Sequence, residues 1–93
     1  MAKAIWRFPL EIMDQQAVSM PERAEILTVQ MQHGAICLWA MVDPDAPKTI
    51  RTIRIVGTNT PISPPEPLAY IGTVQQTFDV FAGSLVWHVF ERI

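Results

Sequence analysis

Residues 24–43, with the sequence AEILTVQMQHGAICLWAMVD, form the stretch around which the rest of this chain must pack. As far as Gln32, apolar and polar residues alternate, which is typical of a strand with one buried face. From Ala35 onward both alternating sets are apolar, so this second strand must be covered on both faces, by a second layer or by another subunit. His33 and Gly34 separate the two halves, and Gly34 can adopt the positive φ of a two-residue turn. The stretch therefore predicts a central β-hairpin.

Apolar and β-branched segments on either side of this hairpin predict further strands. They span residues 4–12, 16–20, 48–57, 68–78 and 85–91. Turn-forming residues separate them at 43–47, 57–67 and 79–84, and the second of these loops holds four of the eight prolines. Pro9 lies inside the first segment, which favours an edge strand or a bulge. Six or seven strands without a long helix predict an all-β fold, a small antiparallel sandwich or barrel with a single domain over residues 1–93.

The charge and the cysteine content limit the classes of function. Seven Lys or Arg and nine Asp or Glu residues give a formal net charge of −2, which argues against a dedicated DNA or RNA binder. A small anionic ligand held by a few local arginines is still compatible with that charge. No apolar run approaches the roughly 20 residues of a membrane span, and no signal peptide is visible. The single cysteine, Cys37, excludes an internal disulfide framework and indicates a reduced, cytoplasmic setting.

Residues that could carry out chemistry are isolated from one another. Cys37, His33 and His88 do not have metal-ligand spacing, and no base stands beside Cys37 to activate it as a nucleophile. Asp43 and Asp45 lie in a Pro-rich turn, where carboxylates usually accept backbone hydrogen bonds. No Gly-rich phosphate loop follows a strand and opens a helix. We therefore expect a protein that is not an enzyme, without catalytic residues, a metal or a cofactor.

A basic cluster marks the candidate binding region. Lys48, Arg51 and Arg54 lie on one predicted strand, with Arg51 on the face of Ile53 and Arg54 on the opposite face. The loop that follows offers Thr hydroxyls and backbone amides suited to an anion. Aromatic side chains on strands usually pack in the core, but beside an arginine they can stack on a purine base. The candidate ligand-binding residues are Arg51, Arg54, Gly57, Thr58, Asn59, Thr60, Tyr70, Trp39 and His88.

Six sequence blocks resemble, in this order, a family of short proteins from tailed phages and prophages. The blocks are Phe-Pro-Leu-Glu-Ile from Phe8, Ile-Leu-x-Val-Gln from Ile26, Cys-Leu-Trp-Ala-x-Val-Asp from Cys37, Arg-Ile-x-Gly-Thr from Arg54, Tyr-Ile-Gly-Thr-Val from Tyr70 and Val-Trp-His-Val-Phe-Glu from Val86. The chain is also similar to the anti-defence sponges, small phage proteins that sequester the cyclic nucleotide signals of host immunity, such as CBASS, without cleaving them. Gly57-Thr58-Asn59 replaces an expected Gly-Thr-Gly, so the loop requires Asn59 to adopt a positive φ.

The resemblance implies a phage anti-CBASS sponge in the host cell cytoplasm, a homo-oligomer with a tetramer favoured and with ligand sites near subunit contacts. Its partner is a small cyclic nucleotide, such as a cyclic dinucleotide, rather than DNA, RNA or a membrane. Arg51 or Arg54 is expected to pair with a phosphate, and an aromatic such as Tyr70 or Trp39 to contact a base. The alternative is a structural or protein-binding module that inhibits a host protein through a β edge or an aromatic patch.

Overall fold

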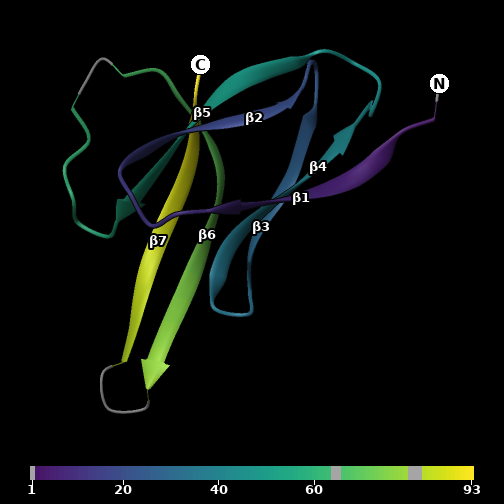
Figure 1. Ribbon diagram of the computed structural model, residues 1–93. Helices are drawn as coiled ribbons and strands as arrows, with labels where there is room; N and C mark the ends of the chain where they lie inside the picture. The colour runs from purple at the N-terminus through teal and green to yellow at the C-terminus, as the bar shows by residue number, and fades with distance from the viewer. Residues whose placement is uncertain (1, 64–65, 80–82) are drawn as a thin grey trace.

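The computed structural model describes residues 2–63, 66–79 and 83–93, and these residues form seven antiparallel strands (Figure 1). The strands are β1 (Ala4–Leu10), β2 (Gln15–Pro21), β3 (Glu25–Gln32), β4 (Ala35–Val42), β5 (Lys48–Gly57), β6 (Leu68–Asp79) and β7 (Gly83–Arg92). The described residues include no helix, and so no helix that could cross a membrane. The all-β prediction is confirmed. The middle of the turn predicted at 79–84 lies outside the described residues.

The strands form two sheets rather than one closed barrel. Sheet 1 has the order β1-β4-β3 and sheet 2 the order β2-β5-β7-β6. Among the described strands, only β3–β4 and β6–β7 are adjacent both in the chain and in a sheet, because the chain changes sheet after β1, β2 and β4, and β7 lies between β5 and β6 in sheet 2. Pro9 lies in β1, an edge strand, where a missing N–H is tolerated.

The central hairpin has the predicted turn. His33 has a φ of 51° and Gly34 a φ of 80°, as a two-residue type I′ turn requires at both of its central positions. Ala35 pairs with Gln32, so the two strands of the hairpin begin their ladder directly at the turn. The local sequence therefore sets the register of β3 and β4.

The main core lies between the inner faces of the two sheets. Its buried members are Leu10, Val29, Ile36, Leu38, Ile53, Ile55, Val74 and Val89. Gly72 on β6 lies so close to β3 that a Cβ at this position would come within 2.7 Å of Val29 Cγ1. The sheets can approach at this point only because Gly72 has no side chain.

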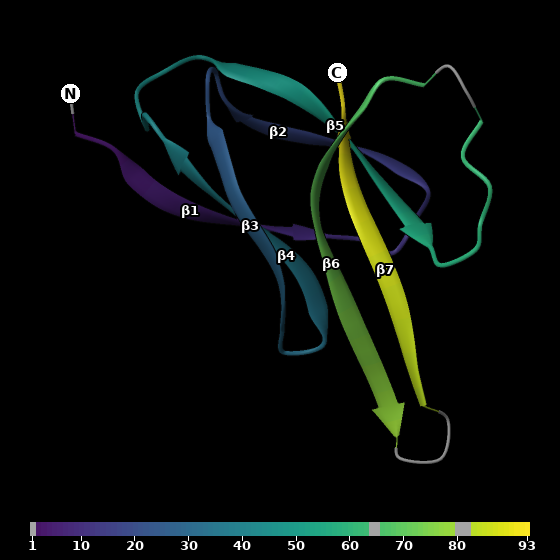
Figure 2. The same ribbon diagram turned by 180° about the vertical axis from the view of Figure 1, so that it is seen from behind.

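The β6–β7 hairpin is the longest element, with strands of 12 and 10 residues. In both views it extends away from the other strands (Figures 1 and 2), and the longest dimension of the molecule is 48 Å. β5 pairs with β7 only between Ile53 and Gly57, so the outer part of β7 pairs with β6 alone. The outer end of this hairpin therefore has no third strand beside it among the described residues.

Candidate functional site

The outer face of sheet 2 combines polar, aromatic and basic side chains in two neighbouring rows. In the first row Arg54 of β5 pairs with Phe90 of β7, and Phe90 pairs in turn with Tyr70 of β6. Residues directly opposite one another in an antiparallel ladder share a face of the sheet. The next row contains His88 and Thr73, which are likewise directly opposite. We call this surface the outer face of sheet 2.

Tyr70 and Phe90 form an exposed aromatic pair on this face. Their ring centroids are 5.5 Å apart in an edge-to-face arrangement, and 62% of Tyr70 is exposed. Edge-to-face contact is a favourable geometry for two aromatic rings because the positive edge of one meets the negative face of the other. The pair therefore gives the face a fixed aromatic surface that water can reach.

A chain of hydrogen bonds links this pair to the loop after β5. Tyr70 Oη lies 2.6 Å from Thr73 Oγ1, which lies 3.0 Å from His88 Nδ1. His88 Nε2 lies 2.8 Å from Thr58 Oγ1. Tyr70 and Thr73 share a face although they are three residues apart, because a register shift between Tyr70 and Gly72 reverses the alternation of β6. Three of the predicted residues, Thr58, Tyr70 and His88, are thus joined through Thr73.

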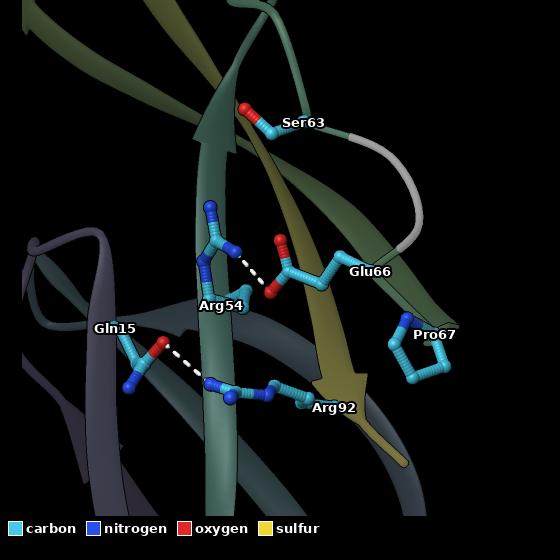
Figure 3. A pocket seen from close by; sticks show the side chains of 6 residues that line it. All are labelled: Gln15, Arg54, Ser63, Glu66, Pro67 and Arg92. Carbon is cyan, nitrogen blue, oxygen red and sulfur yellow. Dashed lines mark hydrogen bonds and ion pairs between the residues drawn. The ribbon is translucent and has the colours of Figure 1, made fainter.

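A hollow of about 360 Å³ lies at the other end of the same face (Figure 3). It is lined by Gln15, Arg54, Ser63, Glu66, Pro67 and Arg92. Arg54 pairs with Glu66, and its Nε donates to the carbonyl oxygen of Asp14 at 3.0 Å. The hydrogen bond to Glu66 raises the pKa of Arg54 above its ordinary value, while burial acts in the opposite direction. Arg54 is therefore a fixed cation in the wall of the hollow.

Arg92 is the second cation of this hollow and has a neutral partner. Its Nη1 donates to Gln15 Oε1 at 3.0 Å, and Figure 3 shows the two side chains meeting across β5. Within residues 2–63, 66–79 and 83–93, Arg92 forms no ion pair with a carboxylate. The hollow thus holds two guanidinium groups against the single carboxylate of Glu66, a net positive charge.

The loop after β5 has the conformation that the sequence requires. Asn59 has a φ of 68°, and the N–H of Thr60 donates to the carbonyl oxygen of Gly57 at 3.2 Å. Two hollows, of about 280 and 470 Å³, share Gly57, Thr60 and Trp87 in their walls. Thr58 lines the larger one and also contacts His88, so the loop adjoins the outer face of sheet 2.

Arg51 lies apart from this face, between the two sheets. Its guanidinium forms a two-pronged ion pair with Glu91, with Nη2 to Oε1 at 2.8 Å, and donates to the carbonyl oxygen of Ala24 at 2.8 Å. The hydrogen bond to Glu91 raises the pKa of Arg51, while partial burial lowers it. Arg51 and Tyr70 both border a cleft of about 490 Å³ beside β3 and β6. The polar groups of Arg51, however, are already occupied by the protein.

Trp39 belongs to a different surface. It lies on β4, directly opposite Arg7 and Thr28, on the face of sheet 1 that points away from sheet 2. Because the sheets pack through their inner faces, Trp39 and the outer face of sheet 2 are on opposite sides of the molecule. One chain cannot bring Trp39 to the same ligand as Tyr70.

Sequence reasoning missed Phe90, Arg92 and Thr73. The first two were detectable, because His88, Phe90 and Arg92 alternate at the period of a strand and must share a face. Thr73 was not, because only the register shift in β6 places it beside Tyr70. Among the residues that the structure describes, no group of three His, Cys, Asp or Glu side chains could hold a metal ion.

The whole chain, residues 1–93, matches the family model of a domain of unknown function, DUF7352, and so belongs to that family. No curated protein and no solved structure was found to match it.

Proposed function

We propose that this member of the DUF7352 family is a non-catalytic binding protein that holds an anionic nucleotide on the outer face of sheet 2. The resemblance to phage anti-defence sponges suggests the ligand class, the cyclic nucleotide signals of host immunity. A sponge of this kind acts in the cytoplasm of the infected host and needs neither a cofactor nor a metal.

The observation that carries the proposal is the position of Arg92 beside an exposed aromatic pair. A guanidinium with only a neutral side-chain partner can form charge-assisted hydrogen bonds with a phosphate without first losing a carboxylate. Arg54 lies in the same hollow, and Phe90 is directly opposite it in the sheet. Phosphate donors and a surface for base stacking are therefore adjacent, which is the combination that nucleotide recognition needs.

The remaining polar groups support binding rather than cleavage. Both ring nitrogens of His88 are engaged by threonine hydroxyls, Thr73 on one side and Thr58 on the other. Among the described residues, no carboxylate bonds a ring nitrogen of His88, the contact that would orient it as a general base toward a nucleophile. This chain of hydrogen bonds is suited to holding polar groups of a ligand in a fixed arrangement.

Calorimetry against cyclic dinucleotides and cyclic ADP-ribose isomers tests the proposal. We expect a dissociation constant in the micromolar range or below for at least one of these ligands. Arg92→Gln should weaken binding about tenfold, the effect of losing roughly 1.4 kcal/mol from one charge-assisted contact. Lys3→Gln removes the same charge from an exposed position outside the site and is the matched control.

Two outcomes contradict the proposal. One is the absence of binding heat with every nucleotide at protein concentrations of tens of micromolar. The other is recovery of a cleaved product, rather than intact ligand, after the complex is denatured by heat. If protein from a host lysate is retained and no nucleotide is, the protein-binding alternative explains the molecule better.

A further inference from the structure

The outer face of sheet 1 is apolar along β4 and polar along β3, where it carries Glu25, Thr28, Gln30 and Gln32. On β4 it carries Cys37, Trp39 and Met41, which alternate with the core residues Leu38, Ala40 and Val42. On β1 it carries Ile5, directly opposite Met41 and 59% exposed. Cys37 is 2% exposed, whereas Trp39 and Met41 are only half-buried. Trp39, Met41 and Ile5 therefore form an apolar surface that sheet 2 does not cover, and a strand that is apolar on both faces needs a cover on each.

Opposite charges lie at opposite ends of this face. Glu25 stands in the row of Met41. The guanidinium of Arg7 lies toward the opposite end of the face, where it donates a hydrogen bond to Gln32 in the row of Ala35. Among the described parts of the chain, neither Arg7 nor Glu25 has an ion-pair partner. The two charges lie three residues to either side of Leu38 along β4.

We propose that a second copy of this chain covers the outer face of sheet 1 in a twofold-symmetric dimer. The twofold axis lies in the plane of the interface, perpendicular to β4, and passes over Leu38. The row of Ala35 in one copy is therefore stacked on the row of Met41 in the other. Glu25 of each copy is then placed over the Arg7–Gln32 pair of the other, while Trp39 and its neighbours are buried at the centre. A face with opposite charges equidistant from its centre is complementary to itself, which a twofold contact between identical surfaces requires.

The size of the face sets the expected affinity. Three strands of seven or eight residues form a smaller patch than the roughly 800 Å² per partner of a standard interface. We therefore expect a dimer that dissociates in the micromolar range. Sedimentation velocity between about 1 and 200 μM should show a shift from monomer to dimer.

Ile5→Glu tests the apolar part of the interface. Ile5 is 59% exposed in the single chain, so the substitution should preserve the fold while it places a charge in the dimer contact. We expect the dissociation constant to increase at least tenfold. Ile50→Glu is the matched control, because Ile50 is 62% exposed on β5 of the other sheet and should leave the dimer unchanged. Circular dichroism confirms that both variants fold.

Charge reversal tests the pairing itself. In a dimer of Arg7→Glu, the new carboxylate of each copy would face Glu25 of the other copy. In a dimer of Glu25→Arg, the new guanidinium of each copy would face Arg7 of the other copy. Each variant alone should therefore be monomeric. A mixture of the two variants restores both opposite-charge pairs and should dimerise. A wild-type chain that remains monomeric at 200 μM overturns the proposal, and so does a dimer unaffected by Ile5→Glu. Failure of the mixture to dimerise overturns the assigned pairing of Arg7 and Glu25.

Discussion

Arg51 and Arg54 are three residues apart on β5, yet they lie in different environments. Arg51 is on the inner side, where it joins Glu91 of sheet 2 to the carbonyl oxygen of Ala24, the residue just before β3. Arg54 is on the outer side, where it joins Glu66 and the carbonyl oxygen of Asp14, both outside the strands. Both side chains are well covered, with 22% of Arg51 and 15% of Arg54 exposed.

The difference between the two lies in which parts of the protein cover them. Arg51 bonds Glu91 of β7 in sheet 2 and Ala24, the residue before β3 of sheet 1, so its interactions contribute to the packing of one sheet on the other. Arg54 is held by connecting segments beside an open hollow, so its interactions leave the sheets independent of it. Of the two, Arg54 is therefore the better candidate for binding a ligand, because its interactions do not hold the two sheets together.

The largest expected effect comes from removing the inner arginine. Arg51→Met should lower the free energy of unfolding by about 2 kcal/mol, between the values for buried and for exposed ion pairs, because Glu91 loses its partner. For a domain of this size the melting temperature should decrease by roughly 10 °C. Arg54→Met should cost about 1 kcal/mol or less, since only a loop is released. Thermal unfolding of both variants measures the contrast, and equal losses would remove the distinction drawn between the two sites.

A second variant, at Gly72, tests how closely the inner faces of the two sheets pack. Gly72→Ala should destabilise the protein by about 1–2 kcal/mol, because the new methyl group meets Val29 and the sheets must move apart. Gly57→Ala is the matched control, since its Cβ would meet only ordinary contacts of 3.4 and 3.6 Å with Thr60 and Trp87. Urea unfolding gives both values. A Gly72 variant as stable as the Gly57 variant would show that β6 is free to move away from β3.

Substitution of Tyr70 tests the outer face of sheet 2 and should have the smallest effect on stability. Tyr70→Leu should weaken nucleotide binding by about tenfold, through loss of a stacking surface worth roughly 1–3 kcal/mol. Stability should change by about 0.5 kcal/mol or less, because the side chain is largely exposed. Tyr70→Phe retains the ring and should bind within about threefold of the wild type, because it loses only one hydrogen bond. Unchanged affinity in Tyr70→Leu would exclude base stacking at this position.

Local sequence predicted the strands, the central turn and, outside the register shifts of β3 and β6, the face on which a side chain lies. Alternation in residues 24–32 and the His33–Gly34 pair led directly to a hairpin, and a period of two separated Arg51 from Arg54. These features depend on backbone geometry over a few residues, so local sequence suffices for them.

The packing of the two sheets, which local sequence does not predict, brings distant residues and faces together. Glu91 reaches Arg51 from 40 residues away, and Trp39 is separated from Tyr70 because their strands belong to different sheets. The register shift in β6 also reverses the simple alternation, so that Tyr70 and Thr73 meet on one face. Pairings of this kind depend on the packing of all seven strands at once, and no local pattern in the chain encodes them.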